Sequence, residues 1–254
     1  MILTVAAQKG GVSKTTTAAA ISQALAVKGK KTLLIDTDAQ GSASLIYGAD
    51  NEETGGTYSL IMGTAKAEDL IKTTEAGSII PASPLLSRLD IELNNKPGRD
   101  SFLKAALEPI KGKYDLITID TPPGLGTELV QALTAADVVI IPLLCDSQAL
   151  QGLHQITETI DEVKKYCNPE LQIAAVLLTQ FNPRATLTRQ YEALIAEHCE
   201  IMGLPLAKTR IRRAIAIDEA HACRANLYLY NADCNPAIDY MTLCEEIGLL
   251  KKGR

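Results

Sequence analysis

Apolar runs and amphipathic segments alternate along the chain. Short, nearly continuous apolar stretches predict buried parallel strands, for example at 1–7 and 171–178. Segments 18–27 and 147–166 carry apolar residues at helical spacing, and the second has charged residues on its other face. This alternation predicts an α/β fold with a mostly parallel twisted sheet flanked by helices. Because no linker-like stretch or internal repeat divides residues 1–254, we expect a single domain.

The apolar runs are too short to cross a bilayer. The run at 138–145 is far below the roughly 20 residues that a transmembrane helix needs, and it contains Pro142. The chain opens directly on a strand-like segment, with no charged region and cleavage site before it, which favours a cytoplasmic location. A net charge of −5 argues against a protein covered in positive charge, but a local basic patch can still bind DNA within a Debye length.

The cysteines form no recognisable metal or disulfide pattern. They are spread without a CxxC pair or a neighbouring set of histidines, at Cys145, Cys167, Cys199, Cys223, Cys234 and Cys244. We therefore expect reduced thiols in or near the core. His154 lies on or beside the apolar stripe of segment 147–166, where a packed or surface role is favoured over catalysis.

A glycine-rich turn joins the first predicted strand to the first predicted helix. Gly10 and Gly11 let the backbone approach phosphate oxygens without a Cβ in the way, and successive N–H groups can converge on an anion. The N-terminus of the following helix adds partial positive charge. The sequence therefore predicts a nucleotide phosphate cradle made of Lys9, Gly10, Gly11, Val12, Ser13, Lys14, Thr15 and Thr16.

Three side chains give this loop the chemistry of a Mg-ATP site. At this spacing Lys14 would neutralise the β- and γ-phosphate oxygens, the Thr15 hydroxyl would coordinate Mg²⁺, and Thr16 could bond the α-phosphate. Ser13 stands where the usual G-x-x-x-x-G-K-[ST] motif has glycine, so it must accept the backbone angles that glycine normally takes. Gln8 replaces the other glycine of that motif.

The run from Lys9 to Thr16 resembles the deviant Walker A motif of the ParA/MinD group of P-loop NTPases, in which a second lysine lies near the start of the loop. In that group the extra lysine reaches the nucleotide of a partner subunit. The resemblance therefore implies a three-layer P-loop NTPase fold and a homodimer that closes face to face on ATP, with Lys9 shared across the interface. A cation placed there would also stabilise charge that develops during phosphoryl transfer.

Two aspartates follow the apolar strand predicted at 32–35. Residues 36–41 read Asp-Thr-Asp-Ala-Gln-Gly, which resembles the D-x-D-x-Q-G switch I segment of the family. Carboxylates just past the end of a parallel strand point into the crevice where α/β folds bind ligands. The resemblance assigns Asp38 to orienting or activating the attacking water and Asp36 to supporting the Mg²⁺ shell.

A third aspartate ends another predicted strand. Residues 114–120 resemble a Walker B strand, and its terminal Asp120 could hold Mg²⁺ through water opposite Thr15. Residues 122–126 contain two prolines and two glycines and resemble a switch II segment, which can report the γ-phosphate by changing its order. The predicted catalytic residues are Lys9, Lys14 and Asp38, and the predicted metal site is Thr15, Asp36 and Asp120.

The C-terminal half predicts contacts to the base and to DNA. By resemblance Thr179, Gln180 and Arg212 lie near the adenine, although the family usually has proline where this chain has Arg212. A cluster of basic residues suggests a patch that binds DNA phosphates without reading bases. These residues are Arg184, Arg189, Lys208, Arg210, Arg213 and Arg224. A solvated charged face is the alternative for them.

Two segments allow more than one interpretation. Residues 51–101 are rich in Gly and Thr and form either a switch-linked insertion or an ordinary crossover between strands. The tail at 236–254 resembles an amphipathic helix, but Asp239, Glu245 and Glu246 oppose an anionic bilayer. We therefore favour core packing of the tail over membrane binding.

Together these features predict an ATPase of the ParA/Soj type that uses ATP and Mg²⁺. The resemblance implies that its ATP-bound homodimer binds nonspecific double-stranded DNA, associates with the nucleoid, and is stimulated by a ParB-like centromere-binding protein. A MinD-like membrane-associated positioning ATPase is the main alternative. A metabolic or electron-transfer member of the same fold is a third, but an iron–sulfur cluster would need paired cysteines.

Overall fold

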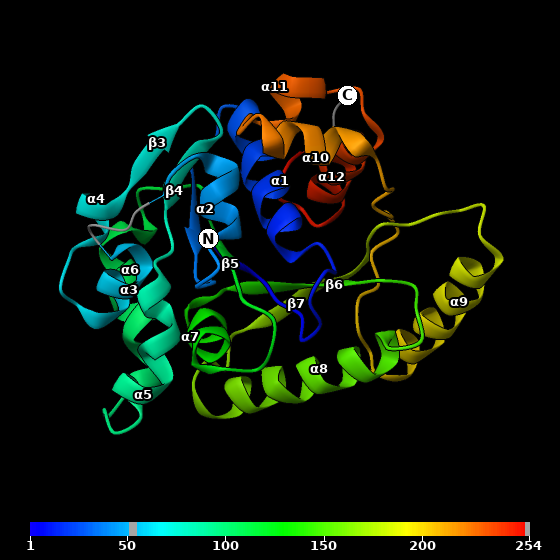
Figure 1. Cartoon of the computed structure of the whole chain (residues 1–254). Helices are drawn as coiled ribbons and strands as arrows, with labels where there is room; N and C mark the ends of the chain where they lie inside the picture. Colours follow the sequence, from blue (N-terminus) through cyan, green and yellow to red (C-terminus); the bar gives the residue numbers. More distant parts are fainter. Residues whose placement is uncertain (51–54, 252–254) are drawn as a thin grey trace.

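A mostly parallel sheet forms the centre of the protein, as the computed structural model of residues 1–50 and 55–251 shows (Figure 1). Among these residues the strand order is β3-β4-β2-β5-β1-β6-β7, and only β3 runs antiparallel to its neighbour. The strands are β1 (Ile2–Val5), β2 (Thr32–Asp36), β3 (Lys72–Thr74), β4 (Gly77–Ile80), β5 (Leu116–Asp120), β6 (Val138–Leu143) and β7 (Gln172–Leu178). The predicted α/β class is confirmed.

Helices cover both faces of this sheet and make three layers. In Figure 1, α7 and α8 lie below the strands, while α1, α10, α11 and α12 lie above them. The helices are α1 (Lys14–Val27), α2 (Ser42–Tyr47), α3 (Gly56–Met62), α4 (Ala67–Leu70), α5 (Leu89–Leu93), α6 (Phe102–Lys111), α7 (Thr127–Ala135), α8 (Ala149–Tyr166), α9 (Thr186–Ile201), α10 (Ile215–Ala222), α11 (Leu227–Asn231) and α12 (Asn235–Glu246), with short 3-10 turns η1 (Pro84–Arg88) and η2 (Arg99–Ser101).

Each face of the sheet has its own apolar core. One core joins alternate strand residues such as Leu33 and Ile119 to α6, α7 and α8. The other joins Leu34 and Val5 to α1, α2, α11 and α12. Because strand residues are buried on both faces, the strands read as continuous apolar runs in the sequence.

The register of the sheet brings three strand ends to one edge. Asp36 pairs with Asp120 between β2 and β5, and Val5 pairs with Asp120 between β1 and β5. The loop that leaves β1 therefore starts next to two carboxylates. This edge is the ligand-binding edge of an open α/β sheet.

The segment between α2 and α6 is a crossover with added structure. Residues 55–101 contain the β3–β4 hairpin, which extends the sheet at its edge, and the short helices α3, α4 and α5. The part of this predicted segment at 51–54 lies outside the described residues. The described part of this segment therefore has the topology of a crossover between strands, which is one of the two predicted alternatives. Topology alone does not test the other alternative, a link to the switch region.

The tail helix α12 packs into the core. Its residues Tyr240, Leu243 and Cys244 are fully buried in the core that also contains α1. The prediction of core packing is confirmed for the described part of the tail. None of the helices in residues 1–50 and 55–251 is long and apolar enough to cross a membrane.

Candidate functional site

The loop between β1 and α1 turns through two left-handed residues. Gly11 has a φ of 74°, and Ser13 has φ 66° and ψ 31°. This region is costly for a residue with a Cβ, so Ser13 holds a conformation that glycine adopts freely. The prediction that Ser13 must accept such angles is confirmed. Helix α1 begins at the next residue, so the orphan N–H groups of its first turn border the loop.

Lys14 is the cation inside this loop. Its side chain is buried, and its Nζ donates a hydrogen bond of 2.8 Å to the backbone carbonyl oxygen of Lys9. Burial lowers the pKa of Lys14, while the nearby charges of Asp120 and Asp38 act in the opposite direction. An ammonium held between a loop and two carboxylates is suited to bind phosphate oxygens.

Asp36 and Asp120 lie side by side at the sheet edge, and both are fully buried. Neither carboxylate oxygen of Asp120 has a hydrogen-bond partner among the described residues. Thr15 lies close enough to lower the pKa of Asp120, although the Thr15 hydroxyl and the carboxylate do not form a hydrogen bond. Burial and the charge of Asp36 nevertheless raise the pKa of Asp120 well above its usual value. An orphaned carboxylate beside a threonine hydroxyl fits a hydrated Mg²⁺, whose preferred ligands are oxygens.

Asp36 has a different environment from Asp120. Its Oδ2 accepts hydrogen bonds from the backbone N–H and the hydroxyl of Ser44, at 2.8 and 2.7 Å, and its Oδ1 accepts one from the Asp38 N–H at 3.1 Å. Burial raises the pKa of Asp36 to about 6, and these hydrogen bonds oppose the rise. Asp36 is thus fixed in orientation, whereas Asp120 keeps its oxygens open.

Asp38 and the predicted switch II segment lie near the loop. Asp38 is only half-buried, and its Oδ1 accepts a hydrogen bond from the Gln40 N–H at 2.9 Å. The N–H of Gly124 donates to the carbonyl oxygen of Gln8 at 2.9 Å, so the switch II segment touches the start of the phosphate loop. A half-buried carboxylate beside the phosphate loop can orient a water molecule.

The ammonium of Lys9 pairs with an aspartate from a distant part of the chain. Its Nζ forms an ion pair of 2.6 Å with Oδ2 of Asp146, and the two side chains are 35% and 33% exposed. Asp146 follows the end of β6 and bonds the Gln148 N–H at the start of α8. The sequence reasoning missed Asp146, although its place just beyond a strand end at the ligand edge could have indicated it.

The three residues predicted near the adenine lie together beside the loop. The Thr179 hydroxyl donates to the carbonyl oxygens of Val12 and Leu143, at 3.1 and 3.2 Å, so it supports the loop. The Gln180 amide donates to the carbonyl oxygen of Gly11 and to the Ser13 hydroxyl. These contacts hold the loop against the end of β7.

A small cavity opens between these residues and the C-terminal helices. Its volume is about 150 Å³, and Thr16, Gln180, Arg212 and Tyr240 are among its lining residues. The guanidinium of Arg212 bonds Asp239 of α12, because its Nη2 donates to Oδ1 of Asp239 at 2.6 Å. Tyr240 of the same helix bonds the Thr17 hydroxyl at 2.9 Å. The tail helix therefore builds one wall of this cavity, which sequence reasoning did not foresee.

The predicted DNA-contacting residues occupy several surfaces. Arg184, Arg189 and Arg213 are exposed, and a bridge between Phe181 and Arg212 brings the loops of Arg184 and Arg213 together. The other three residues of this set, Lys208, Arg210 and Arg224, differ in their contacts.

Arg210 forms an ion pair with Glu192 at 2.8 Å and bonds the Ala207 carbonyl oxygen. Lys208 is exposed and donates only its backbone N–H, to Glu246. Arg224 lies against Gly48 at the end of α2. Arg184, Arg189, Arg213 and Arg224 are all exposed and form no ion pair within the described residues, so they are better placed for phosphate contacts than Arg210.

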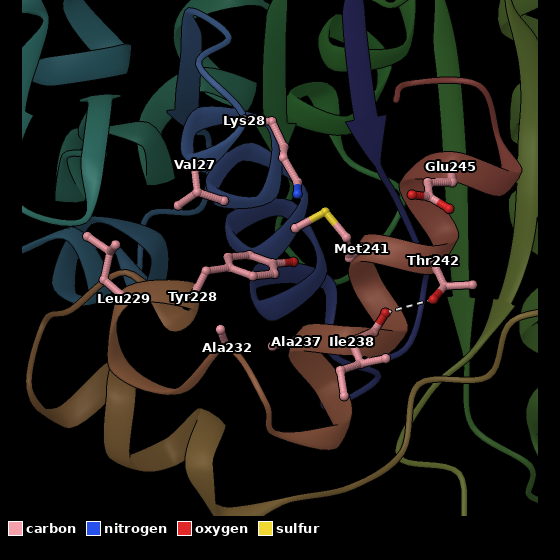
Figure 2. A pocket seen from close by; sticks show the side chains of 10 residues that line it. All are labelled: Val27, Lys28, Tyr228, Leu229, Ala232, Ala237, Ile238, Met241, Thr242 and Glu245. Carbon is pink, nitrogen blue, oxygen red and sulfur yellow. Dashed lines mark hydrogen bonds between the residues drawn. The ribbon is translucent and has the colours of Figure 1, made fainter. Parts of the chain in front are cut away.

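A larger and more apolar groove lies at the other end of α1 (Figure 2). Tyr228 and Met241 point into it from α11 and α12, and Val27 and Lys28 border it from the end of α1. Its volume is about 410 Å³. Because Lys14 and Val27 are 13 residues apart on one helix, about 20 Å separates this groove from the phosphate loop. It is therefore distinct from the nucleotide site.

The fold and this site define a Mg²⁺-dependent nucleotide hydrolase of the P-loop class. A buried lysine in a strand-to-helix loop, a threonine at the first turn and an open aspartate on a neighbouring strand are the parts that this class needs. The second lysine at the loop entrance is an addition to that set.

Comparison with known proteins gives the same class and a family. The family model described as an AAA domain matches residues 1–173. The chain is 38% identical over 251 residues to the chromosome partitioning protein ParA of Caulobacter vibrioides, covering 97% of this chain and 93% of that protein. It is also 38% identical over 251 residues to the sporulation initiation inhibitor protein Soj of Bacillus subtilis, covering 97% of each. The chain belongs to the ParA/Soj family of partitioning ATPases.

A solved structure adds the cofactor. The cobyrinic acid a,c-diamide synthase of Mycobacterium smegmatis, determined with an ATP analogue and magnesium, matches with a TM-score of 0.83 at 32% identity. The match covers 95% of this chain and 91% of that one. Together with the site described above, this relationship identifies the protein as an ATPase that uses Mg-ATP.

Proposed function

We propose that Mg-ATP closes two copies of this protein face to face, and that this dimer binds nonspecific double-stranded DNA on the nucleoid. A ParB-like centromere-binding protein then stimulates hydrolysis and release. The observation that carries this proposal is the separation of the two lysines. Lys14 is buried in the cradle, whereas the ammonium of Lys9 is partly exposed and pairs with Asp146. A partly exposed cation at the entrance of the loop is available to the phosphates of a second copy.

Within one subunit, the environment of each site residue indicates its role. Lys14 and the backbone from Gly10 to Thr16 bind the phosphates, and Thr15 with Asp120 holds the Mg²⁺ shell. When bound there, Mg²⁺ would supply positive charge that neutralises the phosphoryl group during transfer. Asp38, which is half-buried and near the switch segments, orients the attacking water. Gln180 and Arg212 line the small cavity beside the loop, which would take the base.

The DNA step rests on exposed arginines. Arg184, Arg189 and Arg213 offer guanidinium groups that form no ion pair with another residue of the described part of the chain. They lie on or beside the connection between β7 and α9 and in the loop before α10. Such groups bind phosphates without reading bases, so the affinity falls as salt rises. The MinD-like alternative has less support, because the described part of the tail helix packs in the core.

The mass of the protein in solution tests the dimer and the role of Lys9. With Mg-ATP the parent protein should double its mass in light scattering after gel filtration. Lys9→Ala should bind ATP yet need at least tenfold more protein to dimerise, because the cation for the partner's phosphates is gone.

Asp146→Asn is the matched variant that keeps Lys9 but removes its partner in the same chain. A half-exposed ion pair is worth about 0–1 kcal/mol, so this variant should dimerise at an equal or up to several-fold lower concentration. A Lys9→Ala protein that dimerises as readily as the parent would contradict the proposal. Asp146→Asn and Lys9→Ala behaving alike would do the same.

A further inference from the structure

A buried hydroxyl fixes one carboxylate of the metal site. Ser44, in the first turns of α2, donates its N–H and its hydroxyl to the same oxygen of Asp36, at 2.8 and 2.7 Å. Ser44 is buried and Asp36 has no exposed surface. Asp120 on the neighbouring strand has no such donor. Of the two carboxylates, only Asp36 is therefore held in one orientation.

The same hydroxyl is bonded on its other side. The backbone N–H of Ala82, just after β4, donates to the Ser44 Oγ at 2.8 Å. A serine hydroxyl has a single proton, so it donates to Asp36 and accepts from Ala82. The direction of both hydrogen bonds is thus fixed.

The chain around Ala82 is tied in turn to the start of α3. The Thr57 N–H donates to the Pro81 carbonyl oxygen at 2.8 Å, and the fully buried Thr57 hydroxyl bonds the Ile80 and Pro81 carbonyls. At Gly56 the backbones are so close that an added Cβ would collide with the Pro81 oxygen. A continuous buried path therefore runs from Asp36 through Ser44 and Ala82 to α3.

We propose that Ser44 is a positioning residue, which orients Asp36 beside the Mg²⁺ site and couples that site to the segment of α3 and β4. A buried polar network in which every group is hydrogen-bonded holds a single geometry, and its members are strongly coupled. Groups that orient the residues around a metal typically change metal affinity or activity 10- to 100-fold when they are removed. The inference rests on the proposed place of Asp36 near Mg²⁺, and it is independent of dimerisation and DNA binding.

The apparent Mg²⁺ affinity tests this role. Binding of a fluorescent ATP analogue to the full chain is measured as Mg²⁺ is raised from zero. Ser44→Ala should shift the Mg²⁺ midpoint upward by about 10- to 100-fold, with little change in binding when EDTA removes the metal. Ser44→Thr, which keeps the hydroxyl, should return the midpoint to near the parent value. Thr157→Ala removes a buried hydroxyl of α8 that bonds only helix carbonyls, and should leave the midpoint unchanged.

Hydrogen exchange reports the coupling directly. In the parent protein, Mg-ATP should slow amide exchange at Ala82 and Thr57 as well as in the phosphate loop. In Ser44→Ala the loop should still respond while Ala82 and Thr57 no longer do. A merely structural serine would change exchange equally with and without Mg-ATP, and that result would overturn the proposal.

Asp120→Asn separates failure of this inference from failure of the metal assignment. If Asp120→Asn shifts the Mg²⁺ midpoint and Ser44→Ala does not, the role of Ser44 is wrong. If neither variant shifts it, the assignment of both carboxylates to the metal is wrong, and the inference about Ser44 fails with it. Should Ser44→Ala fail to fold, Ser44→Cys keeps the shape with a weaker donor, and an unchanged midpoint in that variant would likewise overturn the proposal.

Discussion

Single residues of the phosphate loop could be assigned from the sequence because their roles depend on local spacing. Lys14 follows the loop glycines at the spacing that phosphate binding needs, and Ser13 was expected to take angles that glycine prefers, as it does. Asp146 could not be found in this way, since its partner Lys9 is 137 residues distant along the chain. The same holds for Ser44, whose importance depends on its contact with Ala82.

Ser13 gives a prediction about stability at the residue scale. Ser13→Gly should raise the free energy of unfolding by about 1 kcal/mol, because a left-handed conformation is unfavourable for serine. The hydrogen bond from Gln180 to its hydroxyl is exposed and long, at 3.2 Å, so its loss subtracts little. Urea denaturation without nucleotide measures the change.

The matched control is Ser42→Gly, at the first residue of α2 and outside the left-handed region. Glycine there removes no strain, so the same substitution should be neutral or destabilising. Equal effects of the two substitutions would mean that Ser13 carries no strain.

At the scale of elements, long apolar strands and the periodic helices were predictable, and short elements were not. The core strands at 1–7 and 171–178 and the helix at 147–166 match β1, β7 and α8 closely. The β3–β4 hairpin escaped prediction because its strands have only three and four residues. Only the last two residues of β4 are buried, so the hairpin forms no long apolar run. The packing of α12 against α1 depends on contacts across more than 200 residues, such as Tyr240 with Thr17.

The approach of α3 to the end of β4 gives a prediction at this scale. Gly56→Ala should lower the free energy of unfolding by about 3 kcal/mol, because its Cβ would meet the Pro81 carbonyl oxygen and its φ of 45° disfavours alanine. Gly63 also has a positive φ, of 70°, but an added Cβ there meets open space. Gly63→Ala should therefore cost only about 1 kcal/mol. If Gly56→Ala and Gly63→Ala lower the free energy of unfolding equally in denaturant, the contact with Pro81 does not contribute to the destabilisation.

At the scale of the whole molecule, the sheet gathers residues from distant parts of the chain at one edge. Two apolar cores hold the strands in register, and the register brings the β1 loop, Asp36 and Asp120 together. The order of motifs along the chain was sufficient to predict this arrangement, since parallel strands end on one side. The surface that binds a partner or DNA was less predictable, because charges close in sequence, such as Arg210 and Arg213, differ in exposure and pairing.

The central claim is that ATP converts this protein into a form that binds DNA. The direct measurement is an electrophoretic shift of random-sequence duplex DNA by the parent protein with Mg-ATP, with Mg-ADP or without nucleotide. A shift is expected only with Mg-ATP. It should weaken steeply as salt rises and be absent for Lys14→Ala. A shift that is equal in all three nucleotide states, or no shift in any of them, would contradict this claim.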